Sequence, residues 1–267
     1  MRQSVLMTGA SSGIGAATAT LLTQRGFRVF GTSREPERVR ERLAAVDWVK
    51  MDVSDEASVR VGVQNVLSAV PHLDALVCCA GYGVFGSIEE TSPERARAQF
   101  DVNVFGTVLP VCAVLPHMRE RGSGRVVIVG SLSGRAAIPF QGHYSATKAA
   151  LDTLVFALRN ELHPYGVRVT LIEPGDIRTE FNDRTDWGDP ARSVYGERIR
   201  RCEQIIKESL PHAPGPELVA RAILRALTAR RPRVRYAVGP ASFLVPLGRR
   251  LLPDRLVLAL VRRHFRV

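Results

Sequence analysis

Residues 4–15, SVLMTGASSGIG, contain a short apolar strand followed by a glycine-rich turn, and residues 16–26, AATATLLTQRG, continue with helical spacing. Strand, glycine-rich turn and helix in this order can bind a dinucleotide. Gly9 permits the tight turn, Gly13 lets a phosphate approach the backbone, and Gly15 lets the helix pack against the strand. The helix N-terminus offers free N–H groups to a pyrophosphate. The spacing is G-x-x-x-G-x-G, which by itself also fits a plain strand-to-helix loop.

Strand-like and helix-like segments alternate along most of the chain. This alternation predicts an α/β fold with a doubly wound, mainly parallel sheet covered by helices on both faces. We expect a single domain over residues 1–239, a lid segment over about 176–215 and a C-terminal extension over 240–267. The expected strands are residues 4–8, 28–32, 48–51, 74–79, 125–130, 167–172 and 234–238.

Small and polar residues follow the expected strands at their carboxyl ends. They include Gly9, Ser33, Asp52, Gly81, Ser131 and Pro174. Ligands of such sheets bind at the carboxyl ends of the strands. These residues therefore predict one shared binding cleft.

The segment SLSGRAAIPFQGHYSATK, residues 131–148, contains three groups able to exchange a proton with an alcohol or ketone oxygen. Tyr144 and Lys148 are four residues apart and lie on one face of a helix. A nearby ammonium favours a phenolate, so we expect Lys148 to lower the pKa of Tyr144. Ser131 adds a hydroxyl from the end of the preceding strand. In isolation, the same spacing also describes a half-buried Tyr beside a solvated Lys.

The end of the second strand bears on which dinucleotide would bind. An acid there usually accepts the ribose 2′-hydroxyl of NAD, whereas here Ser33 and Arg34 come first and Glu35 follows. A guanidinium suits a 2′-phosphate, which favours NADP, although Arg34 could also be a surface residue. Asp52 could accept from an adenine amino group or cap the next helix.

Several residues have simpler expected roles. Asn103 lies inside a long helical region, where a buried amide needs a partner. The four cysteines, Cys78, Cys79, Cys112 and Cys202, have no spacing typical of a metal site. We therefore expect no metal, and reduced thiols in a cytoplasmic protein. We also expect no apolar run long enough to span a membrane.

The motifs together resemble the classical short-chain dehydrogenase/reductase family. They are TGASSGIG at 8–15, AG at 80–81, Asn103, Ser131, YSATK at 144–148 and PG at 174–175. The resemblance reaches about residue 239 and implies a Rossmann-type fold. It is greatest to the 17β-hydroxysteroid and retinol dehydrogenase branch. Where the family usually reads N-N-A-G, this chain reads Cys78-Cys79-Ala80-Gly81.

The resemblance implies roles for individual residues. Tyr144 would be the general acid/base, Ser131 would hold the substrate oxygen, Lys148 would bind the nicotinamide ribose, and Asn103 would hold a water in a proton relay. The resemblance also implies that Asn103, Tyr144 and Lys148 contact the cofactor. The remaining implied cofactor contacts are Gly9, Ser11, Ser12, Gly13, Ile14, Gly15, Arg34, Asp52, Val53, Ala80, Gly81, Pro174, Gly175, Ile177 and Thr179.

The sequence therefore predicts an NADP(H)-dependent oxidoreductase. It would transfer a hydride between nicotinamide and a lipophilic ketone or secondary alcohol, steroid- or retinoid-like. The alternatives are a biosynthetic ketoreductase of a small polar or acyl ketone, and a non-catalytic NADP-binding sensor or scaffold. We expect a homo-oligomer, dimer or tetramer.

The basic character of the chain is concentrated at its end. Residues 229–267 contain ten Arg, no Lys and one Asp, and therefore carry a net charge of +9 out of +11 for the whole chain. Three interpretations of the tail remain open: a helix packed on the domain or a subunit, a wall of a lipophilic pocket, and a peripheral membrane contact. Nucleic-acid binding is disfavoured because aromatic residues are sparse and no motif accompanies the charge.

Overall fold

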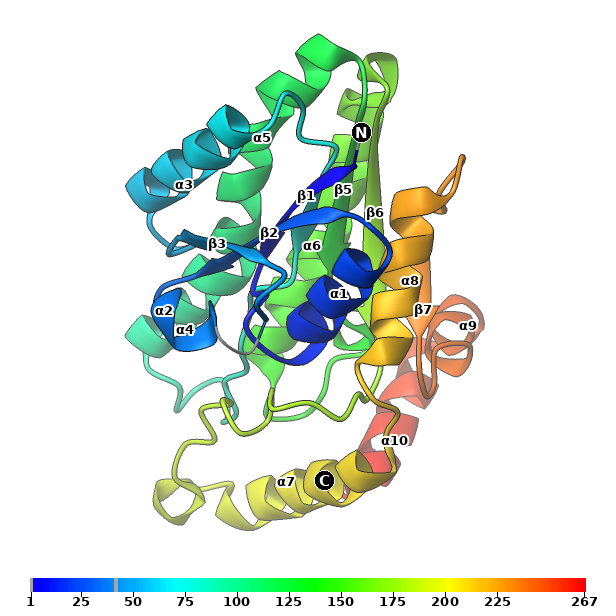
Figure 1. Ribbon diagram of the computed structural model, residues 1–267. Coiled ribbons are helices and arrows are strands. Elements are labelled where there is room, and N and C mark those ends of the chain that lie inside the picture. Colours follow the sequence, from blue (N-terminus) through cyan, green and yellow to red (C-terminus); the bar gives the residue numbers. More distant parts are fainter. Residues whose placement is uncertain (1, 41–42) are drawn as a thin grey trace.

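The computed structural model describes residues 2–40 and 43–267 (Figure 1). Seven strands form one sheet in the order β3-β2-β1-β4-β5-β6-β7, and every neighbouring pair is parallel. The strands are β1 Ser4–Thr8, β2 Arg28–Ser33, β3 Asp47–Lys50, β4 Ala75–Cys78, β5 Gly124–Val129, β6 Val167–Pro174 and β7 Arg235–Val238. Each begins and ends within two residues of its predicted range.

Helices cover both faces of the sheet, so the doubly wound Rossmann-type fold is confirmed. One apolar cluster lies between the sheet and the helices α3 Glu56–Ala69, α5 Gly106–Arg121 and α6 Gly142–Glu161. The other lies beneath α1 Gly13–Gln24 and α8 Glu217–Thr228. The shorter helices α2 Glu37–Arg40 and α4 Pro93–Phe100 lie between these elements in sequence.

The central strand β1 shows why the strands are apolar throughout. Leu6 belongs to the first cluster, whereas Val5 and Met7 belong to the second. Successive strand residues point to opposite faces, and both faces of this sheet are buried. Alternation of polar and apolar residues is therefore not needed in β1.

The long helical stretch Pro93–Arg121 corrects one expectation. It is long and apolar enough to cross a membrane by length and composition alone, although no such run was expected from the sequence. Its Val111, Val114 and Met118 are buried in the core against the sheet. The apolar composition of this stretch therefore follows from packing inside the domain.

The expected lid segment packs around a third apolar cluster. Phe85, Ile199 and Cys202 form its buried centre, and the Trp187 ring lies 4.8 Å from the Phe85 ring, centroid to centroid. Ile199 and Cys202 lie on α7, Gly196–Ser209. The expected lid segment thus shares a small core with Phe85, Phe140 and Phe265 beside the sheet.

The C-terminal residues form two helices, α9 Leu244–Leu251 and α10 Asp254–Phe265. Pro246 and Pro253 predict two breaks in this segment, but Pro246 lies in the first turn of α9, where a backbone N–H has no helical acceptor to lose. Pro253 does separate the two helices. In Figure 1, α10 runs from α9 to α7, and its end joins the third cluster through Phe265 and Val267.

Candidate functional site

The glycine-rich turn between β1 and α1 is shaped by close backbone contacts. Gly9 has φ +65°, and a Cβ there would lie 2.6 Å from the backbone nitrogen of Ala80. A Cβ on Gly15 would lie 2.0 Å from the carbonyl oxygen of Gly9. Only glycine fits at these two points, so the turn leaves its N–H groups accessible at the start of α1.

An anionic group already lies at this turn. The Gly13 N–H donates to Glu180 Oε2 at 3.2 Å, and Arg184 donates to Ser12 Oγ at 2.6 Å. A carboxylate held by this N–H has the charge and acceptor atoms of a phosphate oxygen. The turn therefore fits the pyrophosphate of a dinucleotide, with Arg184 as an additional cation.

A cavity of about 1360 Å³ opens along the carboxyl ends of the strands. It is large enough for a dinucleotide and part of a substrate. It is lined by every predicted site residue except Asn103: Gly9, Ser11, Ser12, Gly13, Ile14, Gly15, Arg34, Asp52, Val53, Ala80, Gly81, Ser131, Tyr144, Lys148, Pro174, Gly175, Ile177 and Thr179. Residues from all parts of the sheet thus converge on one cleft, as the strand ends predicted.

Tyr144 and Lys148 lie one turn apart near the start of α6, and both are buried. Lys148 Nζ is 5.6 Å from the centroid of the Tyr144 ring and donates to the Val129 carbonyl at 3.1 Å. Ser131 is hydrogen-bonded to Tyr144, and its Oγ accepts from the Ser133 N–H at 3.1 Å. The phenol, the amine and the hydroxyl therefore meet at the end of β5.

Burial determines the ionisation of this pair. It raises the pKa of Tyr144 to about 12, and the hydrogen bond with Ser131 only partly opposes it. It also lowers the pKa of Lys148 to about 8. The expected lowering of the Tyr144 pKa by Lys148 is therefore wrong for this structure, because loss of water disfavours the phenolate more than its neighbours favour it. At neutral pH the pair is a phenol beside an ammonium.

Asn103 lies just behind the cavity, in the π-helical turn Asp101–Phe105. It is fully buried, and its Oδ1 accepts from the Tyr82 N–H at 3.0 Å. Its Nδ2 donates to the Tyr82 carbonyl at 3.0 Å and to Thr147 Oγ1 at 3.1 Å. The amide thus ties the loop after β4 to α6, next to Lys148.

The end of β2 presents a basic surface to the cavity. Arg34 is exposed and, with Arg38, lines the cleft. The charge of Arg34 contributes to a lowered pKa of Asp52, whose main cause is the hydrogen bond from the Ser54 hydroxyl. The helix cap in this region is Asp55, not Asp52. Asp52 therefore remains at the cavity wall as a charged acceptor.

Burial also determines the ionisation of the two cysteines at the end of β4. It raises the pKa of the Cys79 thiol to about 12 and raises that of the Cys78 thiol as well. All four cysteines of the chain lie in its described part and are free thiols. The end of β4 before Ala80 and Gly81 therefore carries two neutral thiols.

The sequence named none of the residues at the other end of the cavity, although a wall of a lipophilic pocket was one of the three interpretations of the tail. This end of the cavity is lined by Ile138, Phe181, Ile205, Ile206, Leu210, His264 and Phe265. Apolar periodicity marks α7 and α10 as amphipathic, but it does not show that both face the same cleft. Arg184, too, has no motif around it, and only the folded path of residues 176–215 brings it to Ser12.

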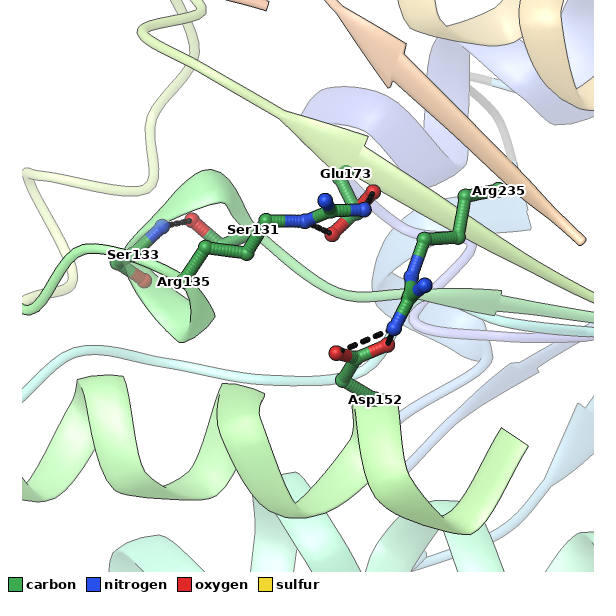
Figure 2. Close-up of polar contacts among 6 residues, drawn as sticks. All are labelled: Ser131, Ser133, Arg135, Asp152, Glu173 and Arg235. Atoms are coloured by element: carbon green, nitrogen blue, oxygen red, sulfur yellow. Dashed lines mark hydrogen bonds and ion pairs between the residues drawn. The ribbon is translucent and has the colours of Figure 1, made fainter. Parts of the chain in front are cut away.

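Two ion pairs hold the loop after β5 and helix α6 to the sheet (Figure 2). Arg135 donates to both oxygens of Glu173, at 2.5 and 2.6 Å, and the Glu173 side chain is only 1% exposed. Arg235 of β7 makes a similar pair with Asp152 of α6, and its guanidinium lies 3.9 Å from the Phe156 ring centroid. The Ser131 loop is thus tied to the end of β6, and α6 to β7.

Comparison with known proteins gives consistent matches. A family model described as short chain dehydrogenase matches residues 3–188. The chain is 34% identical to a 3-ketodihydrosphingosine reductase of Bacteroides thetaiotaomicron, over 96% of this chain and 95% of the relative. It is 35% identical to human 17-beta-hydroxysteroid dehydrogenase type 1, over 95% of this chain and 82% of the relative.

Solved structures match as well. A short-chain dehydrogenase from Streptomyces avermitilis has a TM-score of 0.84 at 33% identity, covering 98% of this chain and 96% of that one. A Burkholderia cenocepacia short chain dehydrogenase in complex with NADP has a TM-score of 0.76 at 27% identity, covering 97% and 96%. A Brucella melitensis 3-ketoacyl-(acyl-carrier-protein) reductase complexed with NADH has a TM-score of 0.76 at 25% identity, covering 90% and 98%.

The buried pair gives a stability prediction. Glu173→Ala should lower the free energy of unfolding by about 3 kcal/mol, because it leaves Arg135 without its buried partner. The control is Asp47→Ala, which removes an exposed ion pair with Arg28 and should cost less than about 1 kcal/mol. Urea denaturation followed by circular dichroism measures both. The double variant Arg135→Leu/Glu173→Leu should recover most of the loss; equal small effects of the two single alanine variants would contradict the prediction.

Proposed function

Because the chain belongs to the short chain dehydrogenase family, whose members are oxidoreductases, we propose that it is an NADP(H)-dependent enzyme that interconverts a lipophilic ketone and its secondary alcohol. The observation that carries the proposal is the meeting of Ser131, Tyr144 and Lys148 in a cavity that also contains the glycine-rich turn. A non-catalytic sensor would not need this set of proton-exchanging groups.

The cofactor, when bound, supplies or accepts the hydride. The Ser131 hydroxyl holds the substrate oxygen, and the buried Tyr144 phenol donates its proton to that oxygen as the ketone is reduced. The Lys148 ammonium stabilises the phenolate that forms and binds the ribose. In the oxidative direction the same groups act in reverse. Asn103 fixes the turn beside Lys148, where a water could complete a proton relay.

The basic groups near the adenosine end support NADP over NAD. Arg34 and Arg38 line the cavity at the end of β2, and Ser12 lies on the glycine-rich turn. A guanidinium can bind a 2′-phosphate through two charge-assisted hydrogen bonds.

The apolar end of the cavity supports a lipophilic substrate. Ile138, Ile205, Ile206, Leu210 and Phe265 line it beyond Tyr144. The names of the two relatives above, a ketodihydrosphingosine reductase and a hydroxysteroid dehydrogenase, specify lipophilic compounds. A reductase of acyl ketones is the second candidate, favoured by the similarity to a 3-ketoacyl reductase structure.

An exposed face of α6 supports the expected homo-oligomer. Thr153, Phe156 and Ala157 are exposed on this helix, and Phe156 is 39% exposed. Small residues around one aromatic ring would let a second helix pack closely. We propose a dimer or tetramer formed through this face.

Tyr144→Phe should lower turnover at least about a thousandfold, because no other group at this position can exchange the proton. Binding of NADPH should remain largely intact, since the ring and its packing are kept. Steady-state assays with steroids, retinoids, aliphatic ketones and 3-oxoacyl thioesters, each with NADPH, identify the substrate, and calorimetry measures cofactor binding. Full activity in the variant would remove Tyr144 from its proposed role, and turnover of the thioesters alone would favour the second candidate.

Arg34→Ala should raise the KM for NADPH about tenfold or more, because a hydrogen bond to a charged group contributes roughly 1.5–3 kcal/mol. The KM for NADH should change little. Arg60→Ala, at an exposed arginine of α3 outside the cavity, is the matched control and should change neither constant. Faster wild-type turnover with NADH than with NADPH at equal low concentration would contradict the cofactor assignment.

The pH dependence of ketone reduction should follow Lys148. Its pKa of about 8 leaves it protonated at lower pH, so kcat/KM should fall as pH rises through about 8 and the ammonium is lost. Lys148→Arg keeps its charge in this range and should show no such fall in its remaining activity. Profiles between about pH 6 and pH 10 test this. An unchanged fall in the variant would assign the ionisation to another group.

A further inference from the structure

Helix α9 exposes an unpartnered apolar face. Phe243, Leu247 and Leu251 follow one another at four-residue intervals on this face, and Leu244 lies beside them. Their exposed fractions are 72%, 38%, 66% and 69%, respectively. Within the described part of the chain, neither α9 nor α10 contains a buried residue. So large an exposed apolar face marks a binding surface.

The charge around this face has one sign. Residues 240–267 contain six Arg and one Asp, with no Lys or Glu. The single Asp254 is already paired with Arg249. Arg250 of α9 and Arg255 and Arg263 of α10 are all exposed. The chemistry that complements this surface is an anionic layer with an apolar interior.

The path of α9 and α10 brings this surface close to the apolar end of the cavity. The end of α10 is held on the domain, because Phe265 packs with Phe85 and Ile199 in the third cluster. His264 and Phe265 also line the cavity. Helix α10 runs from α9 to α7 (Figure 1), and its last residues reach the apolar end of the cleft.

We propose that α9 and α10 dock this protein on the surface of an anionic lipid bilayer, with the leucine-rich face of α9 in the headgroup and acyl boundary. The arginines then lie at the headgroup phosphates, which is the arrangement of helices that bind in a membrane interface. Docking in this way places α10, and with it the apolar end of the cavity, near the lipid. This membrane contact does not depend on the reaction that the site performs.

A second copy of the chain fits the surface less well. In a twofold dimer the same patch meets itself, so the arginines of one copy would face those of the other. Like charges brought together in this way oppose association, and the one carboxylate side chain of the described tail, Asp254, is already paired with Arg249. Anionic lipid headgroups remove this repulsion.

Vesicle flotation tests the proposal with the full chain. Vesicles of equal parts phosphatidylglycerol and phosphatidylcholine should carry the protein upward, whereas vesicles of phosphatidylcholine alone should carry much less. High salt should weaken the binding because it screens the arginines. The variant Phe243→Ser/Leu247→Ser/Leu251→Ser should bind the anionic vesicles at least about tenfold more weakly than the wild type, because three apolar side chains are lost.

The matched control is Val61→Ser/Val194→Ser, which removes two exposed apolar side chains far from the tail in sequence, 56% and 85% exposed. It should bind like the wild type. Thermal melting should be unchanged in both variants, because none of the substituted residues is buried. The proposal is overturned if the wild type does not float with anionic vesicles, or if the triple variant floats equally well. A wild-type dimer that becomes a monomer in the triple variant, with no vesicle binding by either, would instead assign the face to a second copy.

Discussion

Removal of water from the end of β5 is the constraint on which the chemistry of this protein depends. Tyr144 and Lys148 are both buried there, and burial disfavours the charged form of each: the phenol stays protonated, and the ammonium becomes easier to deprotonate but is still the main form at neutral pH. A phenol that keeps its proton can still donate it to an oxygen that becomes strongly basic during reaction.

Two ion pairs and one buried amide hold the elements around Tyr144 and Lys148 in place. The Arg135–Glu173 pair ties the Ser131 loop to the end of β6, and the Arg235–Asp152 pair ties α6 to β7. Asn103 joins the loop after β4 to the same helix through Thr147. Three elements that approach the site from different directions are thus fixed by bonds with defined geometry, whereas apolar contacts alone would permit sliding.

The cleft changes its chemistry along its length. Backbone N–H groups and arginines dominate near the glycine-rich turn, and isoleucine, leucine and phenylalanine side chains dominate beyond Tyr144. A cofactor rich in phosphate and a lipophilic substrate suit the two ends. The apolar end is lined in part by residues of α7 and α10, which lie outside the elements that carry the glycine-rich turn and the Ser131–Lys148 segment.

The sequence by itself determined the sheet, the glycine-rich turn and the positions of Ser131, Tyr144 and Lys148. Strand and helix periodicity are local, and the carboxyl ends of parallel strands must meet at one edge. Only the tertiary structure decided the ionisation of Tyr144 and Lys148, the partners of Asn103 and Glu173, and the contribution of Arg184 and Phe265 to the cavity. These depend on burial and on contacts between residues far apart in the chain, which local spacing does not specify.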